Sequence, residues 1–277
     1  MHRDDLRNVA IIAHVDHGKT TLVDALLKQS HVFAAHEQVG ELIMDSNVLE
    51  REKGITILAK TTSIRYRGIK INIIDTPGHA DFGGEVERVL GMADGCLLLV
   101  DALEGPMPQT RVVLRLALEL GLMPIIVVNK IDRVNARPAE TVEMTHDLLL
   151  ELAKHPDQLN APVIYTNARA GTATVDLRHP GTTLEPLLDA LLAYVPPPKG
   201  DPLGPLQLLV SNLDHDNHIG RLAIGRIARG TIRQGQDVVR CSEAGIGPPQ
   251  RITTLLTVEA LQRSPADVAA AGEIVYL

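Results

Sequence analysis

Residues 13–20 constrain the fold more than any other stretch of the chain, because they read Ala-His-Val-Asp-His-Gly-Lys-Thr. An apolar run at residues 9–12 precedes them, and a helix-like segment at residues 21–27 follows. Strand, glycine-bearing loop, Lys-Thr and helix form the P-loop pattern, whose backbone N–H groups and helix N-terminus attract phosphate anions. The motif therefore predicts a nucleoside triphosphate site.

Two residues of this loop carry most of its chemistry. Lys19 would reach the β- and γ-phosphates, and the Thr20 hydroxyl would hold Mg²⁺. Ala13 stands where the strict pattern has glycine, which is acceptable if the position does not need a positive φ angle. The residues expected to bind the nucleotide here are Asp16, His17, Gly18, Lys19, Thr20 and Thr21.

The composition is that of a globular chain long enough for about two domains, with 277 residues, 45% of them hydrophobic and 22% charged. The longest apolar runs are too short to cross a bilayer, and the N-terminus has no apolar signal region. We therefore expect a cytoplasmic protein without a membrane partner. The two cysteines, Cys96 and Cys241, lie far apart in sequence and predict neither a disulfide nor a metal framework.

Strand-like and helix-like segments alternate up to residue 194, which predicts a doubly wound, mainly parallel sheet with its ligand at the carboxyl ends of the strands. Residues 31–58 show no sustained periodicity, which is typical of a functional or disordered segment. The expected strands are 8–13, 61–66, 69–75, 95–101, 124–129 and 162–166, with a hairpin turn at Arg67-Gly68. The expected helices are 19–29, 82–92, 109–120, 138–153 and 183–194.

The pattern changes after the proline-rich residues 196–202, which read as a stiff linker. Short β-like runs with turn signals follow, for example at 206–213, 219–228 and 236–241. We therefore predict an α/β nucleotide-binding domain at residues 1–195 and a small all-β barrel at residues 203–277.

Two motifs at strand ends indicate which nucleotide is bound. Asp75 ends a strand and is followed by Thr-Pro-Gly, so its carboxylate can hold Mg²⁺ through water while Gly78 offers its N–H to a γ-phosphate. Asn129, Lys130 and Asp132 follow a later strand. Asp132 can accept hydrogen bonds from guanine N1–H and the 2-amino group, and adenine offers neither donor.

Asn129 would bond the base and brace the P-loop, while the Lys130 stem would cover the ring. Asn167 and Ala168 follow another strand, where a backbone N–H contact would complete the guanine pocket; an ordinary loop is the equal alternative. Together these motifs predict GTP and GDP as ligands.

Lys19, Thr56 and His79 are the candidates for catalysis, and Val15 and Ile55 are candidates for its control. The Thr56 hydroxyl could join Mg²⁺ when GTP is bound, and its segment would be released on loss of the γ-phosphate. His79 follows the γ-phosphate loop, where small GTPases carry a glutamine that orients water. Val15 and Ile55 would form an apolar gate that keeps His79 from the water until a partner pushes it in.

The net charge of −7 argues against a globally basic nucleic-acid binder, but residues 221–240 hold five arginines against one acid, a net charge of +4. This stretch reads either as a solvated sheet face or as a contact for RNA phosphates. The scarcity of aromatic residues, 2% of the chain, argues against a base-stacking platform. The five arginines are Arg221, Arg226, Arg229, Arg233 and Arg240.

In this order the motifs resemble those of translational GTPases. The P-loop, Arg-Glu-Lys-Gly-Ile-Thr-Ile at residues 51–57, Asp-Thr-Pro-Gly-His at residues 75–79 and the β-rich segment after them are shared by elongation factors Tu and G. Finer strings resemble the TypA/BipA family, and they lie at residues 44–47, 79–89, 104–111 and 220–230.

The resemblance implies a bacterial, ribosome-binding GTPase whose hydrolysis is stimulated by the ribosome. Beside it, we expect a Mg²⁺-dependent enzyme that is a monomer. The resemblance also implies a role in large-subunit assembly and in stress or low-temperature growth, with contacts to ribosomal RNA and proteins and with tRNA as a further candidate. Residues 203–277 would then be the translation-factor domain II. Two departures are Asn167, where the family usually has serine, and the length, because family members continue past such a barrel. The chain would be a truncated or a reduced form.

Two alternatives remain open at this point. One is another translational GTPase, such as an elongation factor G-like protein. The other is a nucleotide-gated binding module that holds GTP or GDP with negligible turnover.

Overall fold

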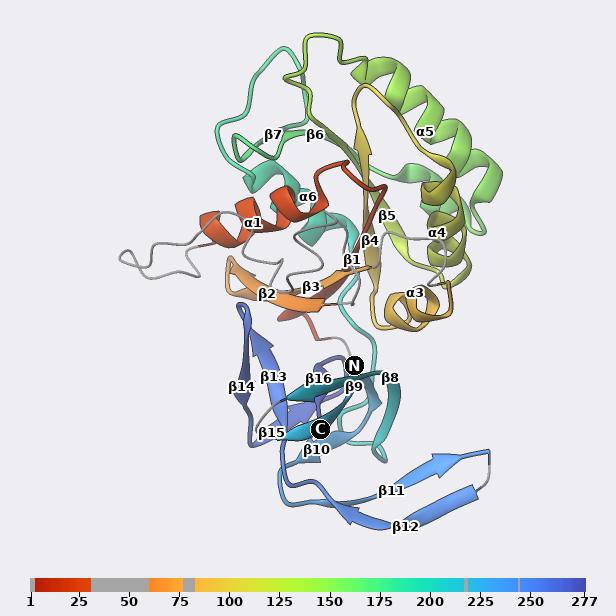
Figure 1. The fold of residues 1–277 in the computed structure, drawn as a ribbon, viewed down its shortest axis with the longest axis vertical. Helices are drawn as coiled ribbons and strands as arrows, with labels where there is room; N and C mark the ends of the chain where they lie inside the picture. Colours follow the sequence, from red (N-terminus) through yellow and green to blue (C-terminus); the bar gives the residue numbers. More distant parts are fainter. Residues whose placement is uncertain (1–2, 31–59, 77–82, 217–218, 244) are drawn as a thin grey trace.

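The computed structural model describes residues 3–30, 60–76, 83–216, 219–243 and 245–277 (Figure 1). Within them, an N-terminal α/β part is followed by a C-terminal part made of strands. None of the helices in these ranges is long and apolar enough to cross a membrane. The predicted domain boundaries at residues 195 and 203 stay a prediction.

A seven-stranded sheet forms the centre of the described N-terminal part, in the order β2-β3-β1-β4-β5-β6-β7. The five inner strands run parallel, and the two edge strands β2 and β7 are antiparallel to their neighbours. The runs of β4 and β5 are buried throughout or nearly so, as expected for central strands covered on both faces. The strands are β1 Leu6–Ala13, β2 Lys60–Tyr66, β3 Ile69–Asp75, β4 Gly95–Asp101, β5 Met123–Asn129, β6 Val163–Asn167 and β7 Thr172–Thr174.

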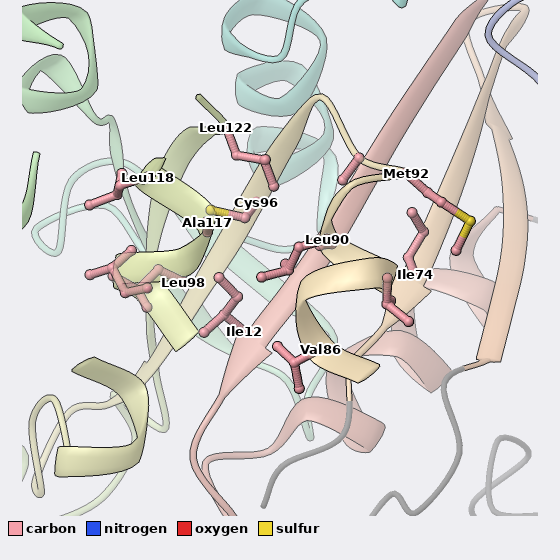
Figure 2. Close-up of a cluster of buried hydrophobic side chains, with 14 of the residues drawn as sticks. Ile12, Ile74, Val86, Leu90, Met92, Cys96, Leu98, Ala117, Leu118 and Leu122 are labelled. Atoms are coloured by element: carbon pink, nitrogen blue, oxygen red, sulfur yellow. The ribbon is translucent and has the colours of Figure 1, made fainter. Parts of the chain in front are cut away.

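Helices cover both faces of this sheet, and alternate residues of each strand point to opposite sides. Val9, Ile11 and Leu97 pack toward α1 and α6. Ile12 and Leu98 pack on the other face, near side chains of α3 and α4 (Figure 2). Leu148 and Leu149 of α5 belong to the same cluster. The helices are α1 Lys19–Gln29, α3 Gly83–Leu90, α4 Pro108–Glu119, α5 Pro138–Leu152 and α6 Glu185–Tyr194, with a short 3₁₀ helix η2 at Pro156–Asn160.

The prediction of a doubly wound, mainly parallel sheet is confirmed, including the β2–β3 hairpin. Its turn consists of Arg67 and Gly68, both with positive φ angles of 49° and 80°. In the described α/β part, η2 and the three-residue strand β7 were not predicted. β1 lies between β3 and β4, so the chain order reverses there. Ligands of such sheets bind at this point, beyond the carboxyl ends of the strands.

The C-terminal part consists of three β-sheets in the described residues. A five-stranded sheet has the order β14-β13-β16-β9-β8, and β10 pairs with β15. The third sheet is a two-stranded ribbon of β11 and β12, which extends away from the rest of the molecule (Figure 1). The strands are β8 Gln207–Asp216, β9 Gly220–Arg229, β10 Thr231–Arg233, β11 Asp237–Ser242, β12 Gly245–Arg251, β13 Leu256–Glu259, β14 Gln262–Pro265, β15 Val268–Ala270 and β16 Ile274–Tyr276.

The two parts are joined by a shared apolar core and by buried polar pairs. Leu222, Ile224 and Tyr276 belong to the same cluster as the α3 residues Val86 and Leu90. Lys70 Nζ lies 3.1 Å from Glu273 Oε1, with both side chains no more than 10% exposed. Arg226 pairs with Asp94 at 2.8 Å. The sheet edge, α3 and the C-terminal strands therefore hold one another in place.

Candidate nucleotide site

The P-loop follows β1 and leads into α1, as its sequence predicts. Gly18 precedes the helix with a φ angle of 96°, a left-handed conformation that favours glycine. A Cβ atom at Gly18 would lie 2.4 Å from Nδ2 of Asn129, so the loop and β5 approach too closely for a side chain. Ala13 does not have a positive φ angle, which explains why alanine is accepted where the strict pattern has glycine.

Lys19 connects the P-loop to the end of β3. Its Nζ lies 2.7 Å from Oδ1 of Asp75 and donates a hydrogen bond of 2.5 Å to the Thr76 carbonyl. The Thr76 hydroxyl donates to the Ile11 carbonyl at 2.6 Å, which ties the chain after β3 back to β1. The structure thus brings together Lys19 and Asp75, two residues that the sequence assigned to the same phosphate and metal site.

Asn129 braces the surrounding loops through both atoms of its amide. Nδ2 donates to the His17 carbonyl of the P-loop at 2.9 Å. Oδ1 accepts a hydrogen bond from the Thr166 hydroxyl and another from the Ala168 N–H, each at 3.0 Å. The P-loop, the end of β5 and the end of β6 therefore meet at one buried side chain.

The Ala168 N–H is therefore engaged inside the protein. The sequence predicted this N–H as a contact for the guanine base, and in the structure it is donated to Asn129 instead. Asn167 follows the same pattern, because its Oδ1 accepts from the N–H of Ala170 at 3.0 Å. A base contact from Ala168 stays a prediction and would require this bond to be shared or exchanged.

Lys130 and Asp132 lie on the loop after β5. Lys130 has a φ angle of 63°, and its Nζ donates to the Asp16 carbonyl of the P-loop. A non-glycine residue in this region is uncommon and is often found at functional sites. Asp132 is exposed, so its carboxylate is accessible to a ligand.

Asp101 is a site residue that the sequence analysis missed. It ends β4, its side chain is 0% exposed, and its Oδ2 lies 2.9 Å from Lys130 Nζ and 3.1 Å from Arg133 Nη1. Burial opposes its ionisation, but the Lys130 hydrogen bond, the Leu103 N–H and the two cations together lower the pKa of Asp101 below its usual value. The available signal was a carboxylate as the last residue of a buried strand, the same signal that identified Asp75.

His17 is buried beneath the P-loop. Its Nδ1 lies 3.3 Å from the Asp101 N–H and 3.4 Å from the Leu99 carbonyl, and its Nε2 lies 3.4 Å from Glu104. Burial lowers the pKa of His17, which favours a neutral imidazole. The imidazole therefore packs beneath the P-loop, and nucleotide binding by His17 stays a prediction.

Several predicted residues lie outside the described residues: Ile55, Thr56, Gly78 and His79. Their roles in metal binding, catalysis and the apolar gate stay predictions. Val15, the other half of the gate, is half-buried in the P-loop. Thr20 and Thr21 are half-buried in the first turn of α1, as expected from the motif.

The arginine-rich stretch does not form one exposed group. The prediction that Arg226 faces RNA is wrong, because its side chain is only 16% exposed and is paired with Asp94 of the α/β part. Its guanidinium also donates to the carbonyl oxygens of Met92 and Ala93. The other four arginines are exposed: Arg221, Arg229, Arg233 and Arg240.

Known proteins match this chain over the residues that form the site. The model of the elongation factor Tu GTP-binding domain family matches residues 4–197. The chain is 54% identical over 272 residues to the large ribosomal subunit assembly factor BipA of Synechocystis sp., and 52% identical over 273 residues to BipA of Bacillus subtilis. These alignments cover 98% and 99% of the chain but 46% and 45% of the relatives.

A putative TypA-like chloroplast elongation factor of Arabidopsis thaliana is 50% identical over 272 residues, which is 98% of this chain and 40% of that protein. The chain thus spans about half the length of the curated relatives it matches. Among solved structures, a bacterial selenocysteine-specific elongation factor, EF-Sec, aligns with a TM-score of 0.73 and 24% identity. That alignment covers 98% of this chain and 41% of EF-Sec and shows a shared fold. The chain belongs to the elongation factor Tu GTP-binding domain family and, within it, to the TypA/BipA group.

Proposed function

We propose that this chain binds GTP and hydrolyses it to GDP and phosphate. The observation that carries the proposal is the meeting of three motifs at one edge of the sheet. Lys19 contacts Asp75, and Asn129 holds the P-loop through the His17 carbonyl. The phosphate-binding and base-binding loops are therefore braced against each other, which reduces the ordering cost of binding a nucleotide across both.

Guanine selectivity rests on Asp132. Its exposed carboxylate would accept two hydrogen bonds from N1–H and the 2-amino group of the base. Adenine would leave the carboxylate desolvated and unpaired, and a site of this kind discriminates by orders of magnitude. The stem of Lys130 would cover the ring, since its Nζ is held at the Asp16 carbonyl.

Mg²⁺ fits the oxygen donors that the two loops present. The Thr20 hydroxyl at the start of α1 and the Asp75 carboxylate at the end of β3 are hard oxygen ligands, the type that Mg²⁺ prefers. When bound, the ion would neutralise charge on the β- and γ-phosphates. Lys19, which is paired with Asp75 in the structure, would turn to the same phosphate oxygens.

Hydrolysis would need an ordered water in line with the γ-phosphate. We assign the orientation of this water to His79 and a further metal contact to Thr56. Val15 and Ile55 would keep His79 away until a partner repositions it. This arrangement gives a slow enzyme that is switched on by docking.

The relatives named as assembly factors of the large ribosomal subunit suggest the ribosome as that partner. In this proposal the chain is a monomeric, cytoplasmic GTPase that acts in large-subunit assembly. Its four exposed arginines would contact ribosomal RNA phosphates, since phosphate contacts supply much of the affinity for nucleic acids.

The test is GTP hydrolysis by this chain against increasing ribosome concentration, with ATP as the control nucleotide. A saturable rise with GTP alone supports the proposal, and its loss in His79→Ala with GTP affinity retained supports the water-orienting role. A flat rate at all ribosome concentrations would overturn ribosome stimulation of this chain. Asp132→Asn should shift preference toward xanthosine triphosphate, and unchanged GTP selectivity would contradict the base assignment.

A further inference from the structure

Asp101 occupies a position between the two loops of the nucleotide site. It is the last residue of β4 and lies in register with Asn129, the last residue of β5. Its side chain is fully buried, and its Oδ1 accepts the Leu103 N–H at 2.8 Å. A buried carboxylate is costly unless it is paired, so its partners must lie close by.

The partners come from the base-binding loop. Lys130 Nζ lies 2.9 Å from Oδ2 of Asp101, and Arg133 Nη1 lies 3.1 Å from the same oxygen. The Arg133 side chain is 41% exposed, whereas that of Lys130 is 22% exposed. Because solvent screens the Arg133 contact more strongly, Lys130 is the main partner.

The same lysine also reaches the P-loop, where its Nζ donates to the Asp16 carbonyl. Asp101 touches that loop directly as well, since its backbone N–H lies 3.3 Å from Nδ1 of the buried His17. A free lysine side chain has many rotamers, and an ion pair at one end selects among them. Asp101 therefore fixes where the Lys130 stem lies relative to the loop.

We propose that Asp101 is a positioning residue that clamps Lys130 between the base-binding loop and the P-loop, and thereby sets the affinity for guanine nucleotides. This inference rests on the proposed function, because it assigns Asp101 a role in that same site. Lys130 covers the base, which GTP and GDP share. The clamp therefore acts on both nucleotides alike and leaves their affinity ratio unchanged.

The experiment compares Asp101→Asn with Asp94→Asn by titration with a fluorescent GDP analogue and by competition with GDP, GTP and ATP. Asp94 is a matched control, because it is a carboxylate just before the same strand, its side chain is only 13% exposed, and it pairs with Arg226 at 2.8 Å. Asp101→Asn should raise the Kd of GDP and GTP by the same factor, about ten- to a hundredfold. Asp94→Asn should leave both Kd values unchanged, although it removes a comparable ion pair.

A double-mutant cycle with Lys130→Met separates a clamp from a general loss of structure. If Asp101 acts through Lys130, Asp101→Asn adds little to the Kd of the Lys130→Met variant. An equal effect in both backgrounds would overturn the inference, as would an Asp101→Asn variant with wild-type affinity. Should Asp101→Asn not fold, Asp101→Glu keeps the charge but displaces it by one methylene, and it should still weaken binding where Asp94→Glu does not.

The two proposals fail in different ways. A wild-type chain that binds neither GDP nor GTP would overturn the proposed function, and the clamp with it. A wild-type chain that binds both, with an Asp101→Asn variant that binds equally well, would overturn the clamp alone.

Discussion

At the scale of single residues, the site depends on how closely the P-loop approaches Asn129. Gly18 makes this approach possible, since its φ angle of 96° and its missing Cβ both suit the contact. The amide of Asn129 can then hold the His17 carbonyl at 2.9 Å. The contact between the P-loop and Asn129 therefore depends on the absence of a side chain at Gly18.

We predict that Gly18→Ala abolishes nucleotide binding or weakens it more than a hundredfold. The added Cβ would meet Asn129 Nδ2 at 2.4 Å and displace the brace. Gly121→Ala is the matched control, because Gly121 has a φ angle of 78° with nothing within 4 Å of its added Cβ. It should cost about 1 kcal/mol of stability and leave nucleotide affinity unchanged. Calorimetric titration with GDP measures the nucleotide affinity of the two variants. Equal affinities would contradict this role of Gly18.

Residues at strand ends were predictable where a motif accompanied them. Asp75, Asn129 and Asp132 were identified because their neighbours complete known phosphate and base patterns. Asp101 carries the same positional signal without a motif, and its partner Lys130 is remote in sequence. Arg226 was assigned wrongly, because a run of arginines in sequence does not reveal which strand face meets another part of the molecule.

At the scale of elements, the pairing of β8 with β9 depends on a local irregularity. The register shifts between Val210 and Asn212, and Gly225 of β9 lies opposite. A Cβ at Gly225 would lie 2.1 Å from the Leu209 carbonyl, so only glycine allows the strands to approach this closely.

Gly225→Ala should therefore destabilise the protein by about 1–3 kcal/mol, the range for overpacking. Gly91→Ala provides the comparison, since its nearest added contacts, at 3.4 and 3.6 Å, are ordinary and its φ angle is not positive. Urea midpoints of the two variants test this. A loss in Gly91→Ala as large as that in Gly225→Ala would refute the argument.

Elements with a strong local pattern were the ones that sequence could predict. The strand at residues 95–101 and the helix at residues 19–29 have the expected bounds, because a continuous apolar run and a P-loop start define them. β7 has only three residues and forms by pairing with β6. The 3₁₀ helix η2 is held in place by Gln158, whose amide donates to the carbonyls of Leu118 and Leu122. Such tertiary partners leave no periodic trace in the sequence.

At the scale of the whole molecule, the α/β part and the strands after it share one core. Residues of α3, β9 and β16 belong to one buried apolar cluster. Ser63 of β2 donates through its hydroxyl to the Val258 carbonyl of β13. The buried Lys70–Glu273 pair lies at the same junction, and Asn72 also donates to Glu273. We expect the two parts to unfold in one cooperative transition.

Glu273→Ala should lower the free energy of unfolding by about 3 kcal/mol, because it leaves Lys70 buried without its nearest partner. This loss is at the low end of the range for broken buried pairs, because Glu259, 3.5 Å from the Lys70 Nζ, still offers the lysine a partner. The exposed pair Arg65–Glu259 is the control, and Arg65→Ala should cost less than about 1 kcal/mol. Urea unfolding followed by circular dichroism distinguishes these values, and two separate transitions in the wild-type chain would contradict a shared core.

The β11–β12 ribbon carries a practical consequence for work in solution. The sequence has two cysteines, of which Cys241 is exposed on the ribbon and Cys96 is buried in β4. Burial raises the pKa of Cys96 to about 12, so its reactive thiolate is scarce at neutral pH. A thiol-directed fluorophore would therefore attach to the native chain at one place, on the ribbon, and would report on its surroundings without any engineered residue.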